Sequence, residues 1–118
     1  MTDPAERRIV FALNDLIRFA DTASRLVARG KSAYESDEAV RLAAEAILHK
    51  IGEAVARLPE EFICAYPDVA WRSMKATRNI VAHEYEQVDY DIIWNALAHR
   101  LPVEADRIRQ VLTAIDTR

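Results

Sequence analysis

The chain has 118 residues, of which 51% are apolar and 30% charged, and its formal net charge is −3. This length fits one domain with a real core, and the acidic balance excludes a protein that holds nucleic acid by bulk positive charge. The single cysteine, Cys64, excludes an internal disulfide and a cysteine-based metal site and fits a reducing compartment.

Two glycines and four prolines among many strong helix formers favour an all-α domain over residues 1–118. The N-terminal stretch contains neither a signal peptide nor an apolar run of membrane length, so we expect a cytoplasmic protein without a membrane partner. We expect no cofactor.

The first half of the chain predicts two long amphipathic helices. The first runs from about Pro4 to Arg29, with Thr2 or Asp3 as its cap and Gly30 at its end. Its predicted buried stripe is Ile9, Leu13, Leu16, Ile17, Ala20, Ser24 and Val27. Residues 31–36 are expected to form a loop in which Ser36 caps the next helix.

The second helix is expected from about Asp37 to Leu58. Its predicted stripe is Val40, Ala43, Ala44, Ile47, Ile51, Ala54, Val55 and Leu58. Gly52 lies inside this helix, where glycine costs about 1 kcal/mol relative to alanine. Close packing against a neighbouring element is a reason to keep glycine there.

The second half predicts shorter helices. Residues 59–67 form a break with room for a helical turn, and a third helix starts near Asp68 and ends near His83. Asp89 is the expected cap of a fourth helix carrying Ile92, Ile93, Ala96 and Leu97. Pro102 breaks or kinks the chain before a last helix with Ile108, Val111, Leu112 and Ile115. The result is an antiparallel bundle of four to five helices.

One motif stands out, Arg78-x4-His83-x-Tyr85. An arginine fork matches phosphate, a histidine carries protons near neutral pH, and a tyrosine hydroxyl donates or receives a modification. Together these groups suit metal-free cleavage of RNA. One His83 removes the ribose 2′-OH proton, Arg78 stabilises the charge on phosphate, and the other His83 or Tyr85 protonates the leaving oxygen. DNA lacks the attacking hydroxyl.

The spacing within the motif restricts how its residues meet. Five residues separate Arg78 from His83, which places them about 140° apart on a regular helix. They converge if the helix ends between them, or if a second copy of the chain supplies the other half in a two-fold dimer. A structural reading stays open as well, in which Arg78 pairs with a carboxylate, His83 marks a helix end and Tyr85 packs.

A second set of polar residues follows one row of the second helix, namely Glu45, His49 and Glu53, with Arg41 extending it. This row resembles a helical metal half-site, but the paired Glu-x-x-His pattern of di-iron bundles is absent, and we expect no metal. A polar face, either solvated or between helices, is the main interpretation. Glu53 follows Gly52 and is therefore a candidate supporting residue, together with Asn79 and Lys75. Arg72, Lys75 and Arg78 recur every third residue, as a solvated face or a local phosphate track.

With these residues in place, the chain resembles the HepT-like ribonuclease toxins of the HEPN superfamily from about Val40 to Leu112. The segments that carry the resemblance are Ile51-Gly52-Glu53-Ala54, Tyr66-Pro67-Asp68-Val69-Ala70-Trp71-Arg72, Arg78-Asn79 through His83-Glu84-Tyr85, Val88-Asp89-Tyr90-Asp91-Ile92-Ile93-Trp94 and Leu101-Pro102.

The resemblance implies a helical homodimer with the motif at the dimer cleft. It implies a metal-independent endoribonuclease toxin, with RNA as substrate and with Arg78 and His83 as catalytic residues. It also implies a minimal nucleotidyltransferase antitoxin that attaches AMP to Tyr85. Glu84 adds a negative charge beside the motif.

Two other functions remain open from the sequence. One is a non-catalytic partner or substrate subunit of a minimal nucleotidyltransferase, in which the motif serves as the site where Tyr85 is modified. A third reading is a metal- or ligand-binding bundle that uses Glu45, His49 and Glu53.

Overall fold

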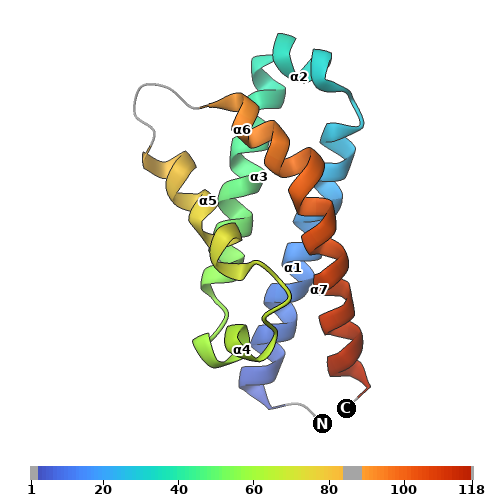
Figure 1. The fold of residues 1–118 in the computed structure, drawn as a ribbon, viewed down its shortest axis with the longest axis vertical. Helices are drawn as coiled ribbons and strands as arrows, with labels where there is room; N and C mark the ends of the chain where they lie inside the picture. The colour runs from blue at the N-terminus through green and yellow to red at the C-terminus, as the bar shows by residue number, and fades with distance from the viewer. Residues whose placement is uncertain (1–2, 84–88, 118) are drawn as a thin grey trace.

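The computed structural model describes residues 3–83 and 89–117, and in this part of the chain every regular element is helical. The all-α prediction is confirmed. Four longer helices run alternately up and down the bundle, joined by shorter helices at both ends (Figure 1). The elements are α1 (Pro4–Val27), α2 (Lys31–Ser36), α3 (Glu38–Ala56), α4 (Glu60–Ala65), α5 (Trp71–His83), α6 (Tyr90–Asn95), a π-helical turn η1 (Ala96–Arg100) and α7 (Leu101–Asp116).

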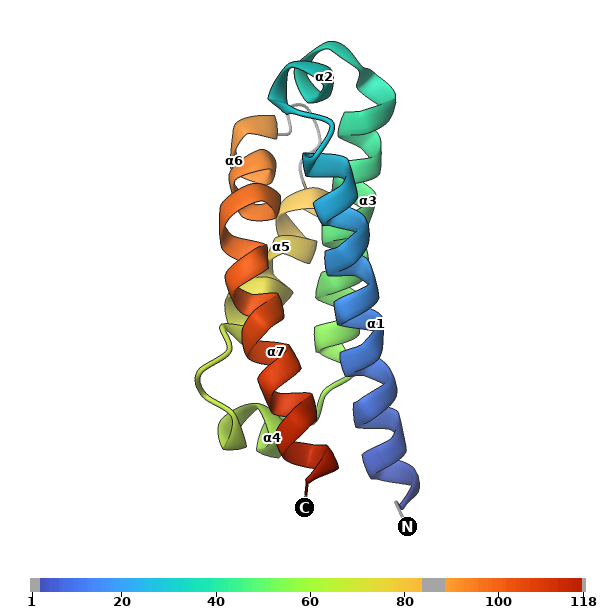
Figure 2. The ribbon, with the colours of Figure 1, turned by 90° about the vertical axis from the view of Figure 1, so that its right-hand side faces the viewer.

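Helix α3 occupies the centre of the arrangement, since it packs against both α1 and α5, and α1 packs against α7 on its other side. Figure 2 shows α1 and α7 side by side, with the chain entering α1 and leaving α7 at the same end of the bundle. Helix α5 lies at one edge, against α3 (Figure 1). In the described residues, no helix is long and apolar enough to cross a membrane.

The buried faces of α1 and α3 follow the predicted period with local errors. Leu13, Leu16 and Ala20 are buried as predicted, but Ser24 is exposed. On α3, Ala43 is exposed, whereas Leu48 is buried. The reason is that each helix contacts more than one neighbour, so its apolar face is wider than a single stripe and is centred elsewhere.

The segment 31–36 is a helix, α2, and the predicted loop is wrong. Gly30 has φ 95°, a left-handed conformation that allows the chain to turn sharply between α1 and α2. The predicted cap at Ser36 is also wrong, because the Asp37 carboxylate accepts from the backbone N–H of Ala39 and begins α3. Tyr34 on α2 is buried, and burial of its ring gives this short helix its tertiary support.

Two predicted caps are confirmed. Asp3 accepts from the N–H of Glu6 at the start of α1, and Asp89 accepts from the N–H groups of Asp91 and Ile92 at the start of α6. The helical turn expected between residues 59 and 67 is α4.

Other predicted positions need correction. Helix α5 begins at Trp71, not near Asp68, since the preceding residues form turns. The Trp71 indole N–H donates to the carbonyl oxygen of Tyr66 and holds that turn. Ile92 is 52% exposed, so it is not part of the core. Near Pro102 the helix changes type, with a π-helical turn before it, and the proline occupies the first turn of α7, where its missing N–H is tolerated.

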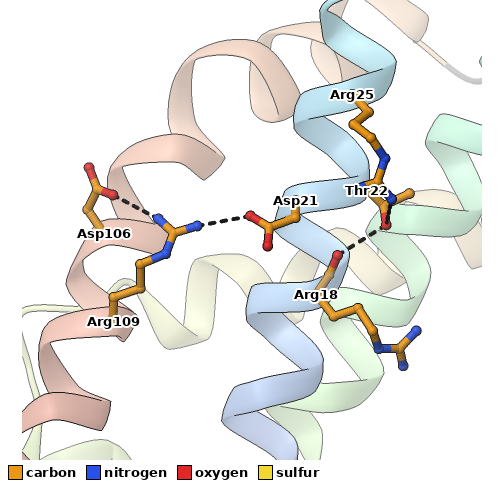
Figure 3. A network of polar contacts seen from close by, with 6 residues as sticks. All are labelled: Arg18, Asp21, Thr22, Arg25, Asp106 and Arg109. Carbon is orange, nitrogen blue, oxygen red and sulfur yellow. Dashed lines mark hydrogen bonds and ion pairs between the residues drawn. The ribbon is translucent and has the colours of Figure 1, made fainter.

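The seam between α1 and α7 carries an ion-pair network on its outer side, drawn in Figure 3. The Arg109 guanidinium on α7 donates to Asp106 on its own helix at 2.9 Å and to Asp21 on α1 at 3.0 Å. All three side chains are between 46% and 74% exposed. Water competes for such groups, so the network contributes little beyond the apolar contacts beneath it.

Candidate functional site

Arg78 lies at a point of close approach between α5 and α3. A Cβ atom built on Gly52 would stand 2.5 Å from the Cβ of Arg78 and 3.2 Å from its Cα and N atoms. Only glycine allows this approach without displacement of one backbone. The packing reason expected for Gly52 is confirmed, and its neighbour is the arginine of the motif.

Glu53, the next residue on α3, orients the Arg78 side chain. Its carboxylate accepts a hydrogen bond from Nη1 of Arg78 at 2.6 Å, and the two side chains are 52% and 30% exposed. This hydrogen bond is the main cause that lowers the pKa of Glu53, with smaller contributions from the charges of Arg78 and His49, while desolvation acts in the opposite direction. Two consecutive residues of α3 therefore fix the arginine, one by its backbone and one by its charge.

Two further motif positions, Asn79 and His83, follow Arg78 on the same helix. Asn79 and His83 belong to α5, which is continuous from Arg78 to His83. The predicted helix end near His83 is confirmed, so the helix does not end between the two residues, and their backbone positions stay about 140° apart. Of the two routes to convergence, a second copy of the chain remains. Tyr85 lies outside the described residues.

Two members of the polar row on α3, Arg41 and Glu45, interact with residues of α2 and α6. Tyr90 on α6 donates its hydroxyl to Glu45, and this hydrogen bond is the main cause that raises the pKa of Tyr90. Arg41 donates to the carbonyl oxygens of Tyr34 and Glu35, and its guanidinium lies 5.5 Å from the centre of the Tyr90 ring. The row joins α3 to α2 and α6.

The metal reading of this row finds no support in the described residues, where no group of His, Cys, Asp and Glu side chains is arranged to hold a metal ion. Half-buried His49 lies between Glu45 and Glu53.

The basic residues before the motif do not form one track. Arg72 pairs with Glu60 of α4, whereas Lys75 is exposed. Arg78 pairs with Glu53. Of the three candidate supporting residues, Glu53 contacts Arg78; Lys75 and Asn79 are placed only on the same helix.

Sequence reasoning missed the cluster at the other end of α3. Tyr34 is 1% exposed and donates its hydroxyl to the carbonyl oxygen of Tyr90 at 2.7 Å. Burial, with the nearby Tyr90 as a smaller cause, raises the pKa of Tyr34 to about 12. The Trp94 ring lies 4.9 Å away. The aromatic residues of α6 are visible in the sequence, but Tyr34, which contacts them, comes 56 residues before Tyr90.

Comparison with known proteins identifies the family. The family described as Ribonuclease HepT-like matches residues 14–111, most of the chain. The chain is 38% identical over 69 residues to "Putative RNase MJ0127" of Methanocaldococcus jannaschii, a stretch that covers 58% of this chain and 57% of that protein. It is 35% identical over 65 residues to "Putative RNase TTE0752" of Caldanaerobacter subterraneus, covering 55% and 58%.

A third relative is "Probable ribonuclease HepT" of Thermococcus cleftensis, 30% identical over 66 residues that cover 56% of this chain and 60% of that protein. The matched stretches therefore span less than two thirds of these three relatives. No solved structure shows a significant similarity to the chain. Because the family match covers most of its length, the chain belongs to the HepT-like ribonuclease family.

Proposed function

We propose that this protein is a metal-independent endoribonuclease that cleaves RNA by attack of the ribose 2′-OH on the adjacent phosphate. The observation that carries the proposal is the fixed Arg78, held at the α3–α5 seam by Gly52 and Glu53. A guanidinium that is oriented before substrate binds stabilises developing phosphate charge without reorganisation at the moment of reaction. Membership of a family described as ribonucleases supports the same reaction class.

In the proposed reaction, each group has one task. His83 takes the proton from the 2′-OH, and Arg78 binds the phosphate oxygens. The bond to the 5′ oxygen then breaks, and this oxygen receives a proton from a second donor. The products are a 2′,3′-cyclic phosphate and a 5′-hydroxyl end. Glu53 is a positioning residue for Arg78, since it touches the guanidinium.

The active form is proposed to be a homodimer. On a continuous helix, positions 78 and 83 of one chain lie about 140° apart, so a phosphate on Arg78 is proposed to meet the histidine of a second copy. A two-fold axis beside α5 brings the motif of a second copy to the same cleft. Light scattering at micromolar concentration that shows only monomer would remove this basis.

The biological role is proposed to be that of a toxin, with a minimal nucleotidyltransferase as antitoxin and Tyr85 as the residue that receives AMP. A phosphodiester charge near the cleft would repel RNA phosphate and compete for Arg78. Co-expression with the neighbouring nucleotidyltransferase, followed by intact-mass measurement of the chain and of its Tyr85→Phe variant, tests this. Neutralisation without any mass change would mean that the antitoxin acts by binding alone.

The test of the reaction uses purified protein and a defined RNA. We expect His83→Ala and Arg78→Ala each to lower the cleavage rate by about 10²–10⁴-fold with the helical content retained. His99→Ala, which removes an exposed histidine of η1, is the matched control and should cleave normally. Cleavage should persist in EDTA and leave cyclic phosphate ends.

Two results would overturn the proposal. Loss of activity in EDTA would indicate a metal-dependent reaction, and equal cleavage of DNA would exclude 2′-OH attack. If the pure protein cleaves no RNA but is still modified at Tyr85, the non-catalytic partner function is the better account, and the Glu53–Arg78 pair is then purely structural.

A further inference from the structure

The proposed reaction leaves one group unassigned, the donor that protonates the 5′ oxygen of a phosphate bound at Arg78. On the continuous helix α5, position 83 lies about 140° around the axis from position 78, where Arg78 contacts α3. A donor must therefore reach this side of the seam from another position.

His49 lies on that side of α3. It is four residues before Glu53 and four after Glu45, so these three side chains project from one face of the helix. Both carboxylates have partners that fix where this face points. Glu53 accepts from Arg78 on α5, and Glu45 accepts from Tyr90 on α6. The face therefore follows the edge of α3 beside α5 and α6, with His49 in its middle.

The helix period places His49 one turn from Glu53, the residue that binds Arg78. Four residues correspond to about 6 Å of rise, so the backbone of His49 stands one turn from the residue that holds the guanidinium. The side chain is half-buried, which leaves part of it open to a ligand.

The electrostatics agree with this placement. The charge of His49 acts on the carboxylate of Glu53 and contributes to the lowered pKa of that group. A histidine carries and donates protons near neutral pH, as a proton donor to the leaving oxygen must.

We propose that His49 is the proton donor to the leaving 5′ oxygen at the phosphate held by Arg78 of the same chain. This inference rests on the proposed ribonuclease function. The 2′-OH loses its proton to His83 of the second copy, the 2′ oxygen bonds to phosphorus, and the bond from phosphorus to the 5′ oxygen breaks. The 5′ oxygen takes the proton from His49. Exchange with water then returns a proton to His49 and removes one from His83.

The test compares two substrates, an ordinary RNA and one in which sulfur replaces the bridging 5′ oxygen at the cleaved bond. A thiolate leaves without being protonated, so the second substrate needs no donor. We expect His49→Gln to slow cleavage of ordinary RNA by about 10²–10⁴-fold and to cleave the sulfur substrate near the parent rate. His83→Ala should stay slow on both substrates, because the base is still missing. His99→Gln is the control for loss of a histidine.

Three outcomes overturn the inference. One is normal cleavage of ordinary RNA by His49→Gln. Another is a slow His49→Gln variant that the sulfur substrate does not rescue, which assigns His49 a structural role. The third is failure of the parent protein to cleave either substrate, in which case the proposed function fails first. Circular dichroism checks the fold, and His49→Ala with added imidazole provides a second variant if the glutamine form is unstable.

Discussion

The α1–α7 and α3–α5 seams each carry an arginine hydrogen-bonded to a carboxylate across two helices, but the pairs differ in what lies beneath them. Arg109 reaches Asp21 at 3.0 Å from a surface position, as one arm of a network with Asp106. Arg78 reaches Glu53 at 2.6 Å, and its backbone lies so close to Gly52 that a Cβ added to Gly52 would stand 3.2 Å from the Arg78 Cα.

The Arg109–Asp21 pair therefore lies on the surface of two helices that are already packed, whereas the Arg78–Glu53 pair belongs to the candidate site. Long exposed side chains hold a surface pair only loosely, and solvent and salt screen it. At Gly52 the backbones set the position of the arginine before its charge acts, so few side-chain torsions are left to fix. We infer that removal of equivalent groups from the two seams affects stability to a similar extent and activity very differently.

The largest effect on stability is expected from Gly52→Ala. Alanine gains about 1 kcal/mol in helix propensity, but its Cβ would stand 2.5 Å from the Cβ of Arg78, which belongs to a packed helix and cannot swing away. Overpacking of this kind costs about 1–3 kcal/mol, so we expect net destabilisation together with loss of RNA cleavage. Urea denaturation and a cleavage assay measure the two effects.

Ala43→Gly is the matched control for Gly52→Ala. Ala43 is exposed on the same helix, so its replacement by glycine removes a methyl group that is not buried in the core. It should be destabilised by about 1 kcal/mol through propensity alone and should keep its activity. An alanine at position 52 that stabilises the protein by a similar amount would show that α5 can move away from α3.

A smaller effect is expected at the other end of α3, from Tyr34→Phe. Loss of the hydroxyl removes the hydrogen bond to the Tyr90 carbonyl oxygen and should cost about 1 kcal/mol near neutral pH. The pKa of Tyr34 is raised to about 12 from the ordinary 10. The stabilisation that the protonated Tyr34 hydroxyl adds to the free energy of unfolding is therefore fully present below pH 10 and is lost as the pH rises toward 12. Phenylalanine has no hydroxyl to ionise, so the free energy of unfolding of the variant does not decrease for this reason.

The measurement is the free energy of unfolding of both proteins between neutral pH and about pH 12. The difference in free energy of unfolding between the parent protein and the variant should decrease above pH 10. A deficit that is the same at every pH would mean that Tyr34 ionises as readily when folded as when unfolded.

Local patterns predict most of the helices because their signals are local. The caps at Asp3 and Asp89 depend on residues two or three positions away. Helix α2 is different, since six residues are too few to display a period. Its tyrosine is fixed by Tyr90, 56 positions later, and by Trp94 in the folded chain. Such a helix is determined by tertiary contacts that no local pattern contains.

The same limit applies to the site. The sequence marks Arg78 by its motif and Gly52 as an anomaly in a helix, but their contact depends on the register of α5 along α3. The pairing of Arg78 with Glu53 follows from that register. The catalytic roles of Arg78 and His83 remain predictions. The proposed role of His49 depends on the partners of Glu45 and Glu53, which fix the direction of the helix face that all three share.

The smallest effects on stability come from a pair of variants that compares the seams directly, Glu53→Gln and Asp21→Asn. Both side chains are about half exposed and both pair with an arginine, and each substitution removes the charge but keeps an acceptor oxygen. Asp21→Asn should change the free energy of unfolding by about 0.5 kcal/mol or less and leave cleavage unaltered.

Glu53→Gln should change the free energy of unfolding by a similarly small amount, but Arg78 then loses the carboxylate that orients it. We therefore expect kcat for RNA cleavage to fall by about 10–100-fold with little change in KM, since misplacement of a positioned group acts on the chemical step. Equal activity of the two variants would contradict the distinction between the seams, and a lower KM for Glu53→Gln with unchanged kcat would show that Glu53 competes with RNA for Arg78 and does not position it.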